Sequence, residues 1–363
     1  MTRVLFCAPS ASNKGGITIW SGIILNYFKE REDKDIILIH FPMDRSVSLT
    51  HLLPTYKRLW YAIKDYGSFP FKLWLALKKN KCDVAHIATV GGVMGSIRDL
   101  MFILICNVLG VKSVIHYHCG SIPRYCIQNN WGWRLQEFVI RHAYRVLVLD
   151  ESSLHVLKLK GYNNVFKIPN PLVQALSEKK EIINRDNYSI LFVGHVVPAK
   201  GIYELLDTLA GIENIKAYII GPRNSEIDKV IEQKINEYNL HNRIFFLGKQ
   251  PMNVVYEYMR KVSLFVLPTY TEGFPMVIME AMANGCPIIT TPVGAIEEML
   301  MTPKGLAGYL VPVRDVKTLK REIIYCLNHK DETLIKAKLA QEKVYSCYTI
   351  ECVVTQLKCI WMN

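Results

Sequence analysis

The chain has 363 residues, of which 50% are hydrophobic and 21% are charged. This balance is typical of a folded soluble protein, and the length favours two domains over one. The formal net charge is +12, and residues 1–170 contain nearly all of the excess, with 22 Lys and Arg against 11 Asp and Glu. A one-sided excess indicates a surface that meets an anionic partner, such as phospholipid headgroups, a lipid diphosphate or nucleic acid.

Other features argue against several classes of protein. The ten cysteines are scattered without a C-x-x-C pair, which disfavours a disulfide framework or a zinc site and predicts reduced thiols in a cytoplasmic protein. The first residues enter a strand-like segment directly and lack a signal-peptide layout. The apolar stretch from Met101 to Leu109 is interrupted by Asn107 and is too short to span a bilayer, so we expect a buried helix there.

Short β-branched runs alternate with helical patterns along the chain. A first series of strands is expected at residues 3–8, 35–40, 83–88, 113–117, 144–149 and 165–168. A second series is expected at residues 189–194, 215–220, 243–247, 262–267, 287–290 and 308–311, with helices from there to the C-terminus. Continuous apolar strands separated by amphipathic helices indicate parallel sheets covered on both faces. Two such series predict an α/β protein with two doubly wound domains.

The best candidate for a linker is the polar, unpatterned segment 170–187. It separates an N-terminal domain at residues 1–169 from a C-terminal domain at residues 188–345. We expect the last helix, at about residues 346–363, to pack back onto the N-terminal domain.

Two features of the first domain suit an anionic ligand. The loop after the first strand ends in Gly15 and Gly16 and leads into a helix, so that backbone amides can approach a phosphate closely. An ordinary β–α turn has the same features, and the loop matches neither the dinucleotide fingerprint nor a Walker loop. His118 lies at the carboxyl end of a strand, where the ligand crevice of an open α/β sheet is found. His116, on the same face, is expected to be structural, and no third ligand is spaced for a metal site.

The second domain contains the sharpest cluster. Lys200, near a helix start, is suited to a diphosphate, although a solvated lysine is the commoner outcome. Pro275 is expected at the first position of a helix, whose free amides form a seat for a diphosphate beside Glu272. Glu280 lies on an otherwise apolar helix, and a buried carboxylate needs partners, which two sugar hydroxyls would supply. An interaction of Glu272 with the helix dipole, and an ion pair of Glu280 with a basic residue, are the plainer alternatives.

The segment at residues 272–287 reads E-G-F-P-x-x-x-x-E-A-M-A-x-G-x-P. It resembles the E-x7-E signature of family-4 (group 1) retaining glycosyltransferases of the GT-B fold. Weaker motifs of that family occur in the same order over nearly the whole chain, namely Gly15-Gly16, His118, Gly194, Lys200-Gly201, Gly221, Gly248, Gly294, Glu298 and Gly308. The resemblance implies two Rossmann-like domains facing across a cleft, and transfer with retention of configuration without a metal ion.

The resemblance also implies roles for individual residues. Glu280 would hold the ribose hydroxyls of a nucleotide-sugar donor, and Glu272 would contact the transferred sugar. Lys200 and the backbone at Gly16 would neutralise the leaving diphosphate, while His118 would line the sugar pocket. The full set expected at the donor comprises Gly15, Gly16, His195, Lys200, Glu272, Gly273, Phe274, Pro275, Met276 and Glu280. No metal ion and no cofactor other than the nucleotide-diphosphate sugar is implied.

The chain departs from the family at two positions. His195 stands where the family usually has Arg, and an imidazole lacks the forked geometry of a guanidinium, although a neighbouring diphosphate favours the protonated ring. We therefore expect activity to fall as the pH rises, with a different profile in His195→Arg. Ala295 replaces a second glycine that is common after Gly294, which leaves the details of that loop open.

The segment at residues 52–81 mixes aromatic and basic side chains with a single acid, Asp65. Such a mixture suits the interface of an anionic membrane, whereas ordinary amphipathic helices with aromatics in the core are the alternative. We expect this basic domain to lie peripherally on the inner face of the plasma membrane. The acceptor there would be a lipid-linked saccharide or another glycan.

Taken together, these features predict a retaining glycosyltransferase of cell-surface glycan biosynthesis. A nucleotide-sugar epimerase or a phosphorylase of the same architecture, and a catalytically silent scaffold subunit, are the alternatives. A nucleic-acid-binding protein is disfavoured because no recognition motif is present. An NAD-dependent dehydrogenase is disfavoured because no G-x-G-x-x-G follows a strand.

Overall fold

The computed structural model describes residues 1–10, 16–44, 55–120, 122–128, 130–173, 176, 178, 185–223 and 225–363. The chain divides into two compact units. Unit 1 comprises Met1–Pro171 together with Ile350–Asn363, and unit 2 comprises Leu172–Thr349. Much of the predicted linker at 170–187 lies outside the described residues.

Unit 1 contains a parallel sheet of six strands in the order β2-β1-β3-β4-β5-β6. Its strands coincide with the first predicted series to within a few residues: β1 (Thr2–Ala8), β2 (Ile36–Pro42), β3 (Val84–Thr89), β4 (Lys112–Tyr117), β5 (Arg145–Val148) and β6 (Val165–Lys167).

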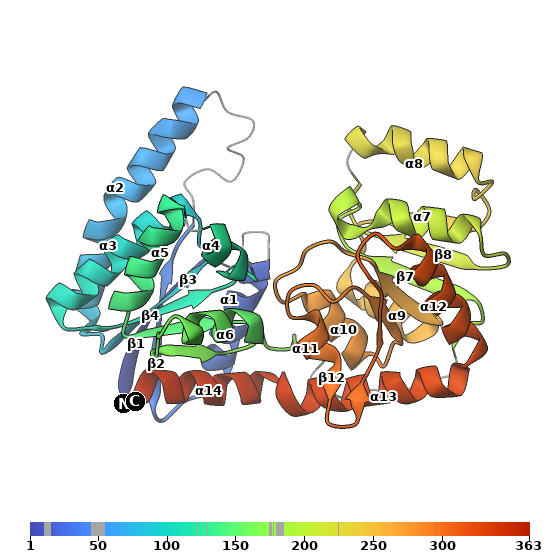
Figure 1. The fold of residues 1–363 in the computed structure, drawn as a ribbon. Coiled ribbons are helices and arrows are strands. Elements are labelled where there is room, and N and C mark those ends of the chain that lie inside the picture. Colours follow the sequence, from blue (N-terminus) through green and yellow to red (C-terminus); the bar gives the residue numbers. More distant parts are fainter. Residues whose placement is uncertain are drawn as a thin grey trace. The chain divides into compact units, whose positions relative to one another are not determined.

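Helices cover both faces of this sheet (Figure 1). One face packs on α1 (Gly16–Glu30) and α14 (Ile350–Met362). The other face packs on α2 (Thr55–Asn80), α3 (Val93–Leu109), α4 (Ile122–Gln128), α5 (Trp131–His142) and α6 (Glu151–Leu159). Alternation along β1 separates the two cores, since Leu5 contributes to one and Phe6 to the other. Strands buried on both sides explain why they read as continuous apolar runs.

The α3 helix is less buried than its sequence indicated. Phe102, Ile103 and Cys106 are buried as expected, but Leu104 is 51% exposed and Val108 is 82% exposed. The expectation of a buried helix is therefore wrong for one face of α3. None of the helices in the described part of the chain is both long and apolar enough to span a bilayer.

Unit 2 repeats the architecture with the strand order β14-β11-β10-β7-β8-β9, in which all pairs are again parallel. The strands are β7 (Ser189–Val193), β8 (Lys216–Ile220), β9 (Ile244–Gly248), β10 (Leu264–Leu267), β11 (Ile288–Thr290) and β14 (Tyr309–Leu310). The second predicted series is therefore confirmed. The prediction of two doubly wound α/β domains is confirmed with it.

The helical elements of unit 2 are a 3₁₀ turn, η3 (Pro198–Lys200), followed by α7 (Ile202–Ala210), α8 (Ser225–Glu237), α9 (Met252–Lys261), α10 (Met276–Ala283), α11 (Ile296–Leu300), α12 (Val316–Asn328) and α13 (Lys330–Cys347). A small antiparallel hairpin of β12 (Met301–Thr302) and β13 (Gly305–Leu306) was not predicted. Strands of two residues are too short to leave a periodic signal.

Strand order reverses once in each sheet. In unit 1 the reversal lies between β1 and β3, and in unit 2 it lies between β7 and β10. The loops that leave the carboxyl ends of two such strands turn to opposite sides of the sheet and open a crevice for a ligand. These are the positions at which a site is expected.

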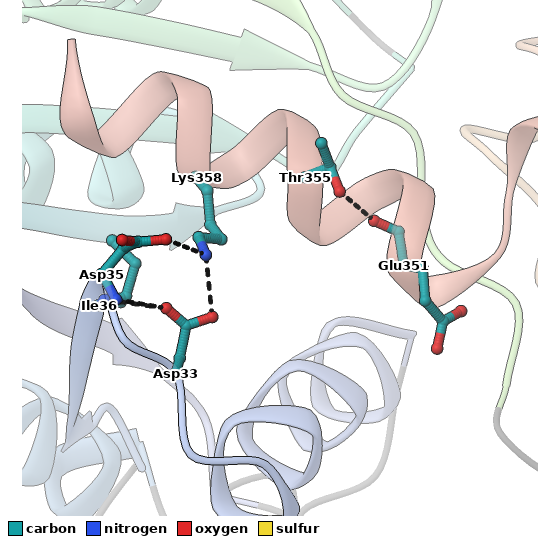
Figure 2. Close-up of polar contacts among 6 residues, drawn as sticks. All are labelled: Asp33, Asp35, Ile36, Glu351, Thr355 and Lys358. Atoms are coloured by element: carbon teal, nitrogen blue, oxygen red, sulfur yellow. Dashed lines mark hydrogen bonds and ion pairs between the residues drawn. The ribbon is translucent and has the colours of Figure 1, made fainter.

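The last helix, α14, is attached to unit 1 by both charge and packing. Figure 2 shows Lys358 of α14 between two carboxylates, with Nζ 3.0 Å from Asp33 Oδ2 and 2.8 Å from Asp35 Oδ2. Trp361 is 1% exposed, and its indole Nε1 donates a 2.9 Å hydrogen bond to Nδ1 of the buried His86. The C-terminal residues are thus part of the core of unit 1.

We expect Trp361→Ala to lower the free energy of unfolding by about 3–5 kcal/mol, because it removes a buried indole and leaves His86 without its donor. Urea unfolding followed by circular dichroism measures this change. Met362→Ala is the matched control, because Met362 is 43% exposed on the same turn and should change stability little. Equal stability of the two variants would contradict the anchoring role of Trp361.

Candidate functional site

The reversal point of unit 2 brings together the two loops that carry most of the predicted site. The loop after β7 leads into η3, and the loop after β10 runs from Pro268 to Pro275. The carbonyl of Ala199 accepts hydrogen bonds from Tyr270 N at 2.8 Å and from Thr269 Oγ1 at 3.2 Å. Gly201 has a φ of +75°, and a Cβ there would lie 2.0 Å from the carbonyl oxygen of Pro268. Only glycine permits this approach of the two loops.

This contact places Lys200 directly against Glu272. Lys200 Nζ lies 2.5 Å from Glu272 Oε1, and the two side chains are 27% and 10% exposed. A charge pair that is mostly withdrawn from water interacts more strongly than an exposed pair. The structure therefore unites a cation and an acid that are 72 residues apart in the sequence.

The segment after Glu272 is held by a neighbouring loop. Gly294 has a φ of +59°, and a Cβ there would lie 2.3 Å from the carbonyl oxygen of Glu272. Ala295 donates its N–H to the carbonyl of Gly273 at 2.9 Å and has a φ of −84°. Alanine adopts this conformation without strain, so the departure from the family at this position leaves the loop intact.

The helix that follows begins one residue later than predicted. Pro275 is the N-cap of α10 rather than its first residue, and Met276 is the first helical residue. Pro275 has a ψ of 114° and continues the extended loop, so the turn starts only after it. Phe274 is buried and packs edge-on against Tyr348 with 5.5 Å between the ring centroids. The first amides of α10 thus follow closely on Glu272.

Glu280 is the most unusual group in this part of unit 2. Its side chain is buried, at 6% exposure, on a helix whose other buried residues include Ile278, Met279 and Met282. No hydrogen bond or ion pair reaches its carboxylate from the residues that the structure describes. Burial raises its pKa from 4.5 to about 7. A buried carboxylate with no internal partner is typical of a site that binds polar groups of a ligand.

The sequence did not single out Glu204, Tyr270 and Arg314, which interact with one another in unit 2. The Tyr270 hydroxyl donates to Glu204 Oε1 at 2.5 Å, and the Arg314 guanidinium carbon lies 4.6 Å from the Tyr270 ring centroid. Burial and the bond to Glu204 raise the pKa of Tyr270 to about 12. Only Tyr270 has a sequence signal, because it precedes Glu272 by two residues. His195, by contrast, was predicted at the site and lies exposed after β7.

Unit 1 contains the remaining predicted residues. Gly15 lies outside the described residues, and Gly16 is the exposed first residue of α1. His118 follows β4 and is half-buried, with its ring centroid 4.2 Å from that of Trp20 and 4.2 Å from that of His116. His116 is fully buried, and burial lowers its pKa to about 3.

Burial also lowers the pKa of His118 well below 6.5, and repulsion from His116 and His86 adds to the effect. A side-chain hydrogen bond with Asn170 opposes the shift, while Nε2 has no partner among the described residues. His118 is therefore a neutral imidazole at neutral pH. Within the described chain no group of three or more His, Cys, Asp or Glu side chains is arranged to hold a metal ion.

The sequence model for "Glycosyl transferases group 1" matches residues 173–342, which is most of unit 2. An uncharacterized glycosyltransferase of Methanocaldococcus jannaschii is 28% identical over 321 residues, covering 85% of this chain and 80% of that one. The UDP-Gal:alpha-D-GlcNAc-diphosphoundecaprenol alpha-1,3-galactosyltransferase of Escherichia coli is 22% identical over 334 residues, covering 86% and 83%. Sucrose-phosphate synthase from Thermosynechococcus elongatus superposes with a TM-score of 0.77 at 19% identity, covering 99% and 98% of the two chains.

The fold is therefore GT-B, a pair of Rossmann-like domains, as the sequence predicted. The match to unit 2 and the relatives place the chain more narrowly. The chain is a glycosyltransferase, and its residues 173–342 match the group 1 family.

The raised pKa of Glu280 predicts how stability depends on pH. The folded state holds the proton more tightly than the unfolded state, so the free energy of unfolding falls as the pH rises from about 4.5 to about 7. Glu280→Gln cannot lose that proton, and we expect it to be more stable than wild type by up to about 3 kcal/mol at about pH 8.

Urea unfolding of the ligand-free protein at several pH values measures this difference, which should vanish below about pH 4. Glu257→Gln, at an exposed position of α9, is the control and should follow wild type at every pH. A Glu280→Gln variant that is no more stable than wild type at about pH 8 would contradict the pKa shift.

Proposed function

We propose that the protein transfers a hexose or N-acetylhexosamine from a nucleotide-diphosphate sugar to a lipid-linked or polysaccharide-precursor acceptor, with retention of configuration and without a metal ion. The observation that carries the proposal is the meeting of the Lys200–Glu272 pair with the first turn of α10 at the reversal point of unit 2. The printed name of the Escherichia coli relative, which states a UDP-galactose donor and a diphosphoundecaprenol-linked acceptor, supports both substrate classes.

In this proposal the donor forms hydrogen bonds and ion pairs with Glu280 and with the Lys200–Glu272 pair. In the described structure of the free protein, Glu280 has no partner, and Lys200 and Glu272 pair with each other. The ribose hydroxyls donate to Glu280, whose buried carboxylate is without a partner in the described structure. The diphosphate accepts hydrogen bonds from the first amides of α10 and attracts the ammonium of Lys200. Glu272 then exchanges Lys200 for a hydroxyl of the transferred sugar.

The chemical step breaks the bond between the anomeric carbon and the diphosphate oxygen. Negative charge builds up on that oxygen, where Lys200 and the helix amides stabilise it. The acceptor hydroxyl attacks from the face that the diphosphate leaves, and its proton passes to the departing diphosphate oxygen. For unit 1 we propose that His118, as a neutral imidazole, hydrogen-bonds the reacting sugar and positions it.

Lys200→Met tests the assignment of the leaving-group cation. We expect kcat for transfer to fall about 10²- to 10³-fold, which is typical for loss of one group that stabilises developing charge. The measurement is release of nucleoside diphosphate from a donor chosen by a thermal-shift screen of nucleotide sugars.

Lys234→Met is the matched control, because Lys234 of α8 forms a similar 2.5 Å pair with Asp207 of α7 and is 21% exposed. The control should keep nearly full activity. Equal activity of Lys200→Met and Lys234→Met would remove Lys200 from the mechanism, and isomerised sugar formed without an acceptor would indicate an epimerase instead.

We further propose that unit 1 contacts an anionic membrane through an exposed apolar face, hereafter the α2–α3 face. It consists of Phe71, Trp74 and Leu75 on α2 and Leu104 and Val108 on α3, which are 36% to 82% exposed. The helix spacing of Phe71, Trp74 and Leu75 puts them on one side of α2. Exposed apolar side chains on two helices that pack against each other mark a candidate contact site.

The charge around the α2–α3 face favours a lipid surface. Lys72, Lys78 and Lys79 are exposed on the same helix, and Lys78 Nζ lies 4.5 Å from the Trp74 ring centroid. Aromatic rings at headgroup depth with lysines beside them suit an anionic bilayer. The side chains of Tyr56, Arg58, Trp60, Tyr61 and Lys64, which also entered the prediction, lie outside the described residues.

Flotation with vesicles of phosphatidylcholine and phosphatidylglycerol at low salt tests this contact. We expect wild type to float with the vesicles and Lys78→Gln/Lys79→Gln to bind about 30-fold more weakly, since each lysine contributes about 1 kcal/mol. Lys317→Gln/Lys338→Gln, which removes the same charge from exposed sites of unit 2, should bind like wild type. Wild type that stays with the soluble fraction would contradict the membrane contact.

A further inference from the structure

Unit 1 contains a cavity that the proposed donor site does not use. It has a volume of about 160 Å³ and lies between the carboxyl end of β2, the middle of α2 and the first turns of α3. The side chains that matter here are Phe41, Asp44, Tyr66, Phe69, Lys72 and Arg98. We call this cavity the β2–α2 pocket. It is smaller than the roughly 300–1,000 Å³ of sites for complete ligands and so suits a single ring or headgroup.

One wall of the β2–α2 pocket is a guanidinium held in a fixed position. Arg98 Nη2 donates to Asp99 Oδ1 at 2.8 Å and to Thr89 Oγ1 at 2.9 Å, and Nε donates to Asp99 Oδ1 at 3.1 Å. Asp99 is fully buried, and Arg98 is 21% exposed. Nη1 has no partner among the described residues and is left to bind a ligand. A group fixed in advance loses little entropy on binding.

A second part of the lining is an aromatic wall. Phe41 and Phe69 pack edge-to-face with 6.2 Å between their ring centroids, and the half-buried Tyr66 lies beside them. Lys72 and Asp44 are exposed and complete the polar part of the pocket. Aromatic walls with a few directed polar groups are the usual lining of a small-molecule site. The lining contains two cations, Lys72 and Arg98, and two acids, Asp44 and Asp65. This mixture suits the donors and acceptors of sugar hydroxyls better than it suits a fully ionised phosphate cluster.

The pocket lies at the edge of the sheet where substrates of this fold are bound. Asp44 Oδ1 accepts the backbone N–H of Ser10 at 2.8 Å, and its second oxygen accepts the Ser10 hydroxyl. Ser10 lies two residues beyond the end of β1, and Thr89, the last residue of β3, accepts from Arg98. Two lining residues of the pocket are therefore bonded to the chain at the reversal point of unit 1.

The α2 helix connects this pocket to the α2–α3 face. Tyr66, Phe69 and Lys72 line the pocket, while Trp74 and Leu75, less than one turn beyond Lys72, belong to the exposed apolar face. We propose that the β2–α2 pocket binds the saccharide headgroup of a lipid-linked acceptor whose lipid remains in the bilayer under the α2–α3 face. Sugar hydroxyls bind Arg98 Nη1 and Asp44, the ring packs on the aromatic wall, and Lys72 contacts the phosphate that joins sugar to lipid. This inference rests on the proposed function.

The test uses the full chain, its preferred nucleotide sugar in labelled form, and a detergent-solubilised lipid extract of the cells that produce the protein. Two rates are measured, namely transfer of label to lipid and hydrolysis of the donor without extract. Tyr66→Ala and Lys72→Glu should lower transfer at least about tenfold at subsaturating extract, which corresponds to about 1.4 kcal/mol. Donor hydrolysis should stay within about twofold of wild type, because the donor site in unit 2 is unchanged.

Lys29→Glu is the matched control, since it makes the same charge change at an exposed site of α1, outside both the pocket and the α2–α3 face. In detergent it should transfer like wild type. Arg98→Lys keeps a cation beside the buried Asp99 but removes the fork, and it should behave like the pocket variants in both transfer and hydrolysis.

Four outcomes decide the matter. Loss of transfer with intact hydrolysis supports the β2–α2 pocket. Unchanged transfer in Tyr66→Ala and Lys72→Glu contradicts the assignment of the β2–α2 pocket as the acceptor site, but it does not contradict the proposed function. Equal loss of transfer and hydrolysis overturns it too, because the effect is then not specific to the acceptor. A wild-type protein that neither transfers nor hydrolyses any donor contradicts the proposed function, and the acceptor assignment fails with it.

Discussion

The reversal of strand order in unit 2 is the constraint on which the candidate site depends. It sends the chain after β7 and the chain after β10 to opposite sides of one sheet, and yet their first residues are neighbours. Lys200 and Glu272 meet only because Gly201 allows the backbone at Pro268 to come so close. A larger residue at Gly201 would separate the two loops and, with them, the charge pair.

The same region contains a residue that lowers the stability of the free protein but suits ligand binding. Glu280 is buried without an internal partner, and in the free protein it is about half protonated near neutral pH. An apolar helix position would be more stable with a neutral side chain. Binding of hydroxyl groups turns that disadvantage into affinity, because the ionised carboxylate is then satisfied. Stability and ligand binding make opposite demands on this one residue.

The sequence predicted the strands well because buried parallel strands read as uninterrupted β-branched runs, and it located the site because Glu272 and Glu280 lie within one short motif. It could not predict the Lys200–Glu272 pair, since the contact depends on how two distant loops approach. It also misjudged α3, where Leu104 and Val108 are exposed. Composition alone does not tell an apolar helix in a core from one with an apolar outer face.

The path of the chain through α14 has a consequence for how the protein can be divided. Unit 1 is discontinuous, because residues 350–363 return to it after the whole of unit 2. A fragment that stops at residue 171 would lack Trp361 and Lys358 and expose the apolar face that α14 covers. The two chain ends lie side by side in Figure 1, and Asn363 O accepts hydrogen bonds from Lys112 and Tyr144. A circular permutant in which residues 350–363 precede residue 1 would therefore build unit 1 from one uninterrupted stretch of the chain.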